Sequence, residues 1–129
     1  MTKDKKIRVL LVDDELDILR IVKKALELKN YEVICASTGN EALEKVNKTI
    51  DIMLLDIMLP DISGYEICAR LKNDSELKDI PVIILSAKTQ MNDIKRGLDV
   101  GVDMYITKPF DPFNIAAQIE DVLQRGGDK

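Results

Sequence analysis

Two adjacent aspartates, Asp13 and Asp14, close the apolar run IRVLLV of residues 7–12. Neighbouring like charges repel each other, so a carboxylate pair at the end of a buried segment needs a cation nearby. A third carboxylate, Asp56, closes a second apolar run, DIMLLD of residues 51–56. Oxygen ligands without histidine or cysteine suit a hard cation such as Mg²⁺, which takes one or two carboxylates and completes its shell with water and phosphate. The three aspartates therefore predict a Mg²⁺ site, provided that the fold brings them together.

A hydroxyl and an ammonium group follow two further apolar segments. Ser86 closes PVIILS of residues 81–86, and Lys108 follows DMYIT of residues 103–107 and precedes Pro109. A lysine is a point charge suited to phosphate, and a carboxylate can attack a phosphoryl group to give an acyl phosphate. Phosphoryl transfer depends mostly on positioning and charge neutralisation, which side chains of these types can supply.

Each of these residues has an ordinary structural explanation when it is taken alone. Asp13 or Asp14 could cap the helix that follows, and Asp56 could be a simple loop residue. A lone serine is uninformative, and a lone lysine is usually a solvated charge. A functional site is favoured because all of these residues follow separate predicted strands.

Five apolar segments alternate with helical patterns along the chain. The predicted strands are residues 7–12, 31–36, 51–56, 81–86 and 103–107. The first, third and fourth are almost continuously apolar, which is typical of strands covered on both faces in a parallel sheet. The alternation predicts an α/β fold with a doubly wound parallel sheet and right-handed crossovers. Functional groups collect at the carboxyl edge of such a sheet, which would unite the three aspartates, the serine and the lysine.

Periodicity and capping patterns predict five helices. They span residues 15–29, 39–47, 64–73, 91–99 and 112–124. The capping signals are Thr38 with Glu41, Ser63 with Glu66, and Asp111 before Pro112. The predicted core stripe of the first helix is Ile18, Ile21, Val22, Ala25 and Leu26. The fourth helix has a thin apolar stripe and contains Gly97, which costs about 1 kcal/mol relative to alanine, so we expect it to be the least stable element.

Composition narrows the classes of function. The chain has 129 residues, the length of one domain, and a net charge of −4 that disfavours direct binding to nucleic acid. It contains no histidine, which excludes Ser-His or Cys-His catalysis and imidazole zinc sites. Cys35 and Cys68 are interpreted as small buried hydrophobic residues. Since neither a membrane-spanning stretch nor a signal peptide is evident, we expect a cytoplasmic protein.

Four motifs resemble those of the receiver domain of bacterial two-component response regulators. They are VLLVDDE (9–15), LLDIMLPDISG (54–64), VIILSA (82–87) and YITKPF (105–110). The resemblance covers residues 6–124 and implies one flavodoxin-like receiver domain over 1–129, with residues 125–129 as a flexible tail. It also implies the strand order 2-1-3-4-5, which is the order described for a chemotaxis member of that family. Such a chain could be a stand-alone regulator of the chemotaxis type, a relay intermediate or a receiver cut from a longer protein.

The resemblance assigns the metal site and the phosphoacceptor. Asp56 corresponds to the phosphoacceptor. Asp13 and Asp14 correspond to the acidic pair that holds Mg²⁺, together with Asp56 and the backbone carbonyl of Met58. Adjacent residues at a strand end point in different directions. We therefore expect Asp14 to contact the metal most directly and Asp13 to act at least partly from behind it.

The resemblance also assigns the residues that respond to phosphorylation. Ser86 and Lys108 correspond to the hydroxyl and the lysine that contact the phosphoryl group, and Tyr105 corresponds to the aromatic switch residue. The peptide bond between Lys108 and Pro109 is expected to be cis. The implied function is a signalling switch in which phosphorylation of Asp56 reshapes the surface formed by the fourth helix, the fifth strand and the fifth helix.

The implied partner is a histidine kinase or a phosphotransfer protein, which would supply the phosphohistidine that this chain lacks. Leu16 and Leu19 lie outside the predicted core stripe of the first helix and beside Asp14, with Arg20 and Lys23 nearby. We expect these four residues to dock that partner. The downstream target is a protein that the sequence does not identify, and we expect neither direct nucleic acid binding nor membrane binding.

Two other functions fit parts of the pattern. A Mg²⁺ phosphatase with an aspartyl intermediate usually has a second acid two residues after its nucleophile, where this chain has Met58. A constitutive binding module with a degenerate pocket would lack some of the site residues, all of which are present. We therefore expect a chain that catalyses only its own Mg²⁺-dependent phosphorylation and dephosphorylation and is not otherwise an enzyme.

Overall fold

Five strands and four helices make up the part of the chain that the structure, a computed structural model, describes: residues 6–87 and 101–127. Their bounds are β1 (Arg8–Val12), α1 (Leu16–Leu28), β2 (Glu32–Ala36), α2 (Gly39–Lys45), β3 (Ile52–Asp56), α3 (Gly64–Lys72), β4 (Val82–Ala87), β5 (Met104–Lys108) and α5 (Pro112–Gly127). The predicted fourth helix, over 91–99, lies outside the described residues. The other predicted elements are present, most of them with ends within two residues of the prediction.

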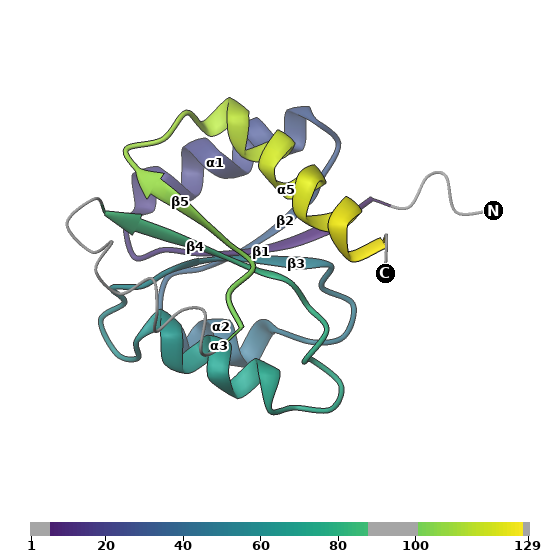
Figure 1. The fold of residues 1–129 in the computed structure, drawn as a ribbon. Helices are drawn as coiled ribbons and strands as arrows, with labels where there is room; N and C mark the ends of the chain where they lie inside the picture. Colours follow the sequence, from purple (N-terminus) through teal and green to yellow (C-terminus); the bar gives the residue numbers. More distant parts are fainter. Residues whose placement is uncertain (1–5, 88–100, 128–129) are drawn as a thin grey trace.

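The strands form one parallel sheet in the order β2-β1-β3-β4-β5. Helices α1 and α5 cover one face of the sheet, and α2 and α3 cover the other (Figure 1). Every residue of β3 is buried, and so is β1 beyond its first residue. This arrangement confirms the predicted doubly wound sheet and its strand order, and it explains why the central strands are almost continuously apolar.

The alternation of side chains along each strand divides the hydrophobic core into two layers. In β4, Ile83 and Leu85 pack in the layer that contains residues of α1 and α5. Val82 and Ile84 pack in the layer that contains residues of α2 and α3. Ser86 continues the series of Val82 and Ile84, so its side chain belongs to the α3 side of the sheet.

Capping interactions begin α2 and α3 where the sequence predicts. The Thr38 hydroxyl accepts a hydrogen bond from the Glu41 amide at 3.0 Å, and the Glu41 carboxylate accepts one from the Ser37 amide at 2.7 Å. The Ser63 hydroxyl accepts from the amide of Tyr65 at 3.1 Å. Each cap satisfies amide groups that have no partner inside the helix.

Helix α5 ends later than predicted, since it runs to Gly127 where the sequence predicts an end at 124. Arg125 lies 3.6 Å from Asp121, an i,i+4 ion pair that supports the last turns. A glycine costs a helix only about 1 kcal/mol relative to alanine, so Gly126 and Gly127 do not by themselves stop it.

The predicted surface of α1 was wrong at two positions. Leu19, expected on the surface, is only 8% exposed and packs in the core, whereas Ile21, expected in the core, is 50% exposed. The buried arc is centred near Val22. At about 100° per residue, Leu19 lies about 60° from that centre and Ile21 about 100° from it, so Leu19 falls inside the arc and Ile21 at its rim.

This correction predicts unequal costs for two similar truncations in α1. Leu19→Ala should lower the free energy of unfolding by about 2–4 kcal/mol, because it leaves a cavity in the core. Ile21→Ala should cost less than about 1 kcal/mol, because that side chain is half exposed. Urea denaturation of both variants measures the difference, and equal costs would contradict the burial seen for these two positions.

Candidate functional site

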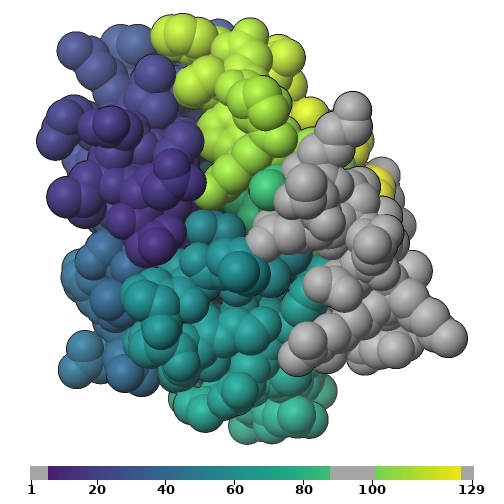
Figure 2. Space-filling model, turned by 90° about the vertical axis from the view of Figure 1, so that its left-hand side faces the viewer, coloured from purple at the N-terminus to yellow at the C-terminus, as the bar shows by residue number. Residues whose placement is uncertain are grey.

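Three carboxylates from two strand ends meet at the carboxyl edge of the sheet. Carboxylate oxygens of Asp13, Asp14 and Asp56 lie within 4.8 Å of one another. Figure 2 views the molecule from this edge, where the start of α1 (purple), the segment after β3 (teal) and the segment after β5 (yellow-green) come together. The sheet brings these residues together because β1 lies next to β3 and all strands run parallel.

Lys108, at the end of β5, ties these carboxylates together. Its Nζ donates to Asp13 Oδ2 at 2.8 Å, to Glu15 Oε1 at 3.2 Å and to Asp56 Oδ2 at 3.4 Å. Sequence reasoning missed Glu15 as a partner of the lysine. The available signal was its position directly after the acidic pair, in the motif VLLVDDE. One ammonium group therefore faces four carboxylates when Asp14 is included, which leaves the cluster with excess negative charge.

The two adjacent aspartates have different environments. Asp13 is fully buried, and its Oδ1 accepts a hydrogen bond from the Glu15 amide at 2.9 Å while its Oδ2 accepts from Lys108. Asp14 is exposed. Both oxygens of Asp13 are thus engaged in holding the site together, whereas the carboxylate of Asp14 faces solvent. This difference supports the expectation that Asp14 would contact a metal ion most directly.

Asp56 is 5% exposed and is held by two donors on different segments. The amide of Met58 donates to its Oδ1 at 3.2 Å, and Lys108 donates to its Oδ2. Burial, reinforced by the charge of Asp13, raises the pKa of Asp56 from 3.8 to about 6 against the opposing effects of Lys108 and the Met58 amide. At neutral pH most molecules therefore keep an ionised Asp56, which is the form that can act as a nucleophile.

Lys108 stays protonated despite its partial burial. Burial acts to lower the pKa of its ammonium group, but the hydrogen bond to Asp13 and the charges of Asp56 and Asp13 outweigh it and raise the pKa to about 12. A permanently charged ammonium beside Asp56 is suited to neutralise an incoming phosphoryl group. The peptide bond that follows, Lys108–Pro109, is cis, which confirms the expectation for this bond.

Gly64 lets α3 begin directly against the backbone of Asp56. A Cβ atom on Gly64 would lie 2.5 Å from the carbonyl oxygen of Asp56, which no side chain can tolerate. The Gly64 amide also donates to the carbonyl of Ile57 at 2.9 Å. The segment after Asp56 is therefore fixed at its far end by a contact that only glycine permits.

Ser86 and Tyr105 lie beyond the carboxylates, on β4 and β5. Ser86 is fully buried, and its hydroxyl donates to the carbonyl of Ala87 at 3.2 Å. The Tyr105 hydroxyl lies 3.1 Å from the hydroxyl of Tyr65 in α3. Sequence reasoning missed Tyr65, because its pattern marks it only as a residue in the first turn of a helix.

The four residues predicted to dock a partner do not share one surface. Leu16 and Arg20 are exposed, and Lys23 pairs with Glu27 along the helix. Leu19 belongs to the core, as described above, and cannot offer its side chain to a partner. The prediction that it docks a partner was therefore wrong, because the buried arc of α1 includes it.

An apolar cavity of about 450 Å³ lies beside the carboxylates, between α1 and the connection from β5 to α5. Its lining residues are Glu15, Ile18, Ile21, Lys108, Pro109, Phe110 and Pro112. The half-exposed Ile21 lines this cavity, whereas Leu19, which the sequence analysis expected at the partner surface, does not. Sequence reasoning missed the cavity because it is built from segments that are distant in the chain.

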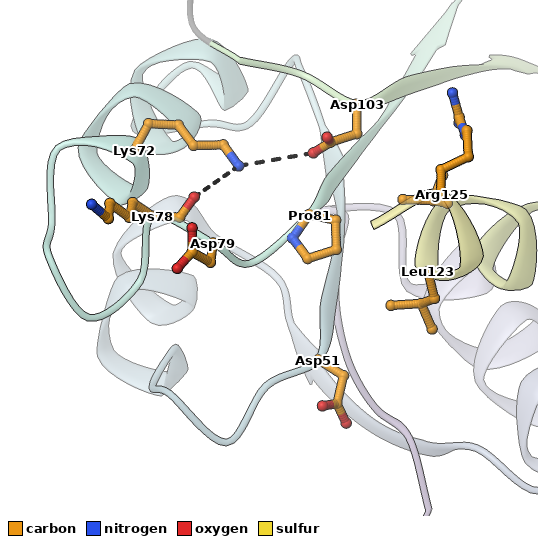
Figure 3. Close-up of a pocket in the computed structure, with 9 residues that line it drawn as sticks. Asp51, Lys72, Lys78, Asp79, Pro81, Asp103, Leu123 and Arg125 are labelled. Carbon is orange, nitrogen blue, oxygen red and sulfur yellow. Dashed lines mark hydrogen bonds and ion pairs between the residues drawn. The ribbon is translucent and has the colours of Figure 1, made fainter. Parts of the chain in front are cut away.

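A second cavity, of about 600 Å³, lies at the opposite edge of the sheet (Figure 3). Lys72 points across it and donates to the carbonyls of Ile80 at 2.9 Å and Lys78 at 3.3 Å, and it lies 3.8 Å from Asp103. Asp103 in turn accepts a hydrogen bond from the amide of Val82 at 2.8 Å. Lys72 and Asp103 thus hold the connection between α3 and β4 in place through these hydrogen bonds, so we attribute a structural role to them.

The family model described as "Response regulator receiver domain" matches residues 9–120. The chain belongs to this family, the receiver domains of two-component response regulators. It is 44% identical to the response regulator SaeR of Staphylococcus epidermidis over 117 residues, which are 91% of this chain and 50% of that protein. The chain thus spans about half the length of the curated relatives that it matches.

Solved structures of receiver domains have the same fold. A CheY-like response regulator receiver domain protein from Methanospirillum hungatei superposes with a TM-score of 0.87 at 30% identity, over 96% of this chain and 98% of that one. The "BeF3 Activated DrrB Receiver Domain" superposes with a TM-score of 0.80 at 32% identity, over 93% of this chain and 99% of that one. Among the residues that our structure describes, no helix has the length and apolar character needed to cross a membrane.

The raised pKa of Asp56 predicts that, in the absence of metal, Asp56→Asn increases the free energy of unfolding by an amount that depends on pH. The carboxyl group ionises near 3.8 when unfolded and near 6 when folded, so its charge destabilises the fold increasingly between pH 4 and 6 and fully above pH 6. Removing that charge should stabilise the protein by about 1–2 kcal/mol at pH 7.5, after allowance for solvent screening.

Urea denaturation of both proteins in EDTA, at several pH values, measures this gain. The two proteins should converge near pH 4, where the folded wild type is protonated at Asp56. A gain that stays constant from pH 4 to 7.5 would attribute the effect to packing and contradict the electrostatic explanation.

Proposed function

We propose that Asp56 accepts a phosphoryl group from the phosphohistidine of a partner histidine kinase or phosphotransfer protein. The observation that carries this proposal is the placement of Lys108, whose single ammonium group contacts both the buried Asp13 and Asp56. This arrangement gives a nucleophilic carboxylate, a fixed positive charge and a cluster of oxygen ligands at one point. It is suited to phosphoryl transfer, in which positioning and charge neutralisation supply most of the catalysis.

The residues of the site fit a Mg²⁺ ion, which receiver domains generally use at their acidic pocket. Asp13, Asp14 and Asp56 offer closely spaced oxygens, and Lys108 leaves their negative charge only partly balanced. We propose that Asp14 and Asp56 hold the ion, that Asp13 supports it from behind, and that the backbone carbonyl of Met58 completes the protein ligands. Mg²⁺, when bound, supplies positive charge for the phosphoryl oxygens and orients them.

The proposed reaction needs no acid or base from this chain. An oxygen of the Asp56 carboxylate forms a bond to phosphorus while the bond between phosphorus and the partner's imidazole nitrogen breaks, and the electron pair of that bond returns to the imidazole. Lys108 neutralises the phosphoryl oxygens as they approach. The amide of Met58, which donates to Oδ1 at 3.2 Å, keeps the carboxylate oriented.

Phosphorylated Asp56 can change the conformation of the molecule by making contacts that the unphosphorylated carboxylate does not make. An aspartyl phosphate adds negative charge and strong hydrogen-bond acceptors at the end of β3. Ser86, whose hydroxyl donates to the Ala87 carbonyl at rest, could turn to the phosphoryl group, and Lys108 could leave Asp13 for it. Only contacts of this kind, present in one state and absent in the other, can shift the balance between two conformations. We propose that this shift favours the inward orientation of the Tyr105 ring and changes the surface of β5 and α5.

We propose that this chain is not an enzyme acting on other substrates. Met58 occupies the position two residues after Asp56, where an aspartyl phosphatase would have a second acid. The chain would then catalyse only its own phosphorylation and the hydrolysis of its own acyl phosphate.

The apolar cavity beside Lys108 supports a proposal for where the phosphoryl donor docks. A partner's phosphohistidine must reach Asp56, and an apolar surface beside Lys108 is formed by Ile21 with the segment from Pro109 to Pro112. Leu16 and Phe113 add exposed apolar area near the same helix ends. Arg20, exposed beside this surface, could meet acidic groups of the partner. We propose this combined surface as the docking site.

Phosphorylation of Asp56 is tested by mass spectrometry after incubation with acetyl phosphate and Mg²⁺. One added phosphoryl group is expected in the wild type and none in Asp56→Asn, because Asp56 closes β3 next to the acidic pair that follows β1 and within contact of Lys108. EDTA should abolish the addition. Asp79→Asn, at the opposite edge of the sheet, is the matched control and should behave as the wild type. A full signal that persists in Asp56→Asn would refute the assignment.

The docking surface is tested by comparing two phosphoryl donors. Ile21→Asp should slow transfer from a cognate kinase by at least about tenfold, since a charge in an apolar contact costs on the order of 1.4 kcal/mol or more. Phosphorylation by acetyl phosphate, which needs no docking surface, should be unchanged. Leu28→Asp is the control, because Leu28 is also a large apolar residue exposed on α1, at 70% against 50% for Ile21, but lies at the far end of the helix. Equal losses with both donors would indicate damage to the fold and contradict the docking role.

A further inference from the structure

A hydrogen bond between two tyrosines joins α3 to the edge strand β5. Tyr65, in the first turn of α3, is 1% exposed and is among the largest fully buried side chains. Its hydroxyl lies 3.1 Å from the hydroxyl of Tyr105 in β5. This contact spans 40 residues of sequence and involves the residue that the family resemblance assigns as the aromatic switch.

The contact lies on the side of the sheet to which Ser86 belongs. Tyr105 pairs with Ile84 across β4 and β5, and it packs against the core layer that contains both Ile84 and Tyr65. Ser86, two residues after Ile84, points to the same side of β4. The tyrosine pair therefore reaches over β4, the strand that carries the switch hydroxyl.

The first turn of α3 is also fixed relative to the phosphoacceptor. Gly64, the residue before Tyr65, leaves no room for a Cβ atom because that atom would lie 2.5 Å from the carbonyl oxygen of Asp56. Its amide donates to the carbonyl of Ile57 at 2.9 Å, and the amide of Tyr65 donates to Ser63 Oγ at 3.1 Å. A short chain of close contacts thus runs from the Asp56 backbone through Gly64 and Tyr65 to Tyr105.

We propose that Tyr65 is a positioning residue of the switch, whose hydroxyl holds Tyr105 in its inward orientation. The Tyr65 hydroxyl is buried, so a Tyr105 ring that reaches it must point into the molecule, and a ring turned to solvent loses the bond. The proposal rests on the proposed function, in which phosphorylation favours the inward ring. By linkage, a bond that favours the inward ring then also strengthens binding of the phosphoryl group.

The test is a double-mutant cycle on the affinity for beryllofluoride in the presence of Mg²⁺, used as a phosphoryl analogue. Tyr65→Phe removes one hydroxyl and keeps the buried ring, so the variant should fold. It should bind beryllofluoride about two- to tenfold more weakly, the range expected for one hydrogen bond. In a Tyr105→Phe background, where the bond is already absent, the same substitution should have no further effect.

Tyr31→Phe is the matched control. The Tyr31 hydroxyl also makes a hydrogen bond, to the carbonyl of Ala116 at 3.4 Å, but it belongs to the core layer on the other face of the sheet. Its loss should leave beryllofluoride affinity unchanged. The chain has only three tyrosines, so ring-labelled protein should give three assignable NMR signals. The Tyr105 signal of resting Tyr65→Phe should move away from its position in the beryllofluoride-bound wild type.

Two results would overturn the proposal. One is a Tyr65→Phe affinity equal to that of the wild type. The other is an equal loss in the wild-type and Tyr105→Phe backgrounds, which would assign Tyr65 a purely structural role. A wild type that binds no beryllofluoride and takes no phosphoryl group from acetyl phosphate would overturn the proposed function itself. That outcome is distinct, because it does not depend on either tyrosine.

Discussion

The ammonium group of Lys108 is the interaction on which the rest of the site depends. Asp13 is fully buried at the end of β1, and an unpaired carboxylate there would cost several kcal/mol. Lys108 offsets this cost with a contact of 2.8 Å, and its bond to Asp56 joins the ends of β1, β3 and β5 at one point. The same charge also limits how far burial can raise the pKa of Asp56, so it keeps the carboxylate ionised at neutral pH.

The imbalance around this lysine explains how the site can have two states. Asp13, Glu15 and Asp56 already share the Lys108 ammonium at rest, and the exposed Asp14 adds a further negative charge. A phosphoryl group on Asp56 would compete with these carboxylates for the same donor. Since Lys108 cannot serve all of them at short distance, phosphorylation must redistribute its contacts, and a redistribution of contacts is what a switch requires.

The sequence predicts the residues that lie at the ends of the strands. It does not predict contacts that depend on how helices and strands pack against one another. Asp56 and Lys108 could be placed at one edge because every strand of a parallel sheet ends at the same side. The burial of Leu19 could not be predicted, because the apolar residues of α1 cover a wide arc whose centre is set by the packing of α5 against it. The contact between Tyr65 and Tyr105 was missed for a similar reason, since nothing local to either residue marks the other.

In the proposed function, the two faces of the sheet separate the docking surface of the phosphoryl donor from the pair of tyrosines. The apolar cavity with Ile21 and Phe110 lies on the side of α1 and α5, whereas Ser86, Tyr65 and Tyr105 belong to the side of α3. The carboxylates stand between the two sides, at the strand ends. A donor bound on the α1 side would therefore not contact the tyrosine pair, which belongs to the core layer on the other face. A phosphoryl group on Asp56 would then act on both sides of the sheet. It would act on the α1 side through Lys108, which lines the apolar cavity, and on the α3 side through the close contact of the Asp56 backbone with Gly64.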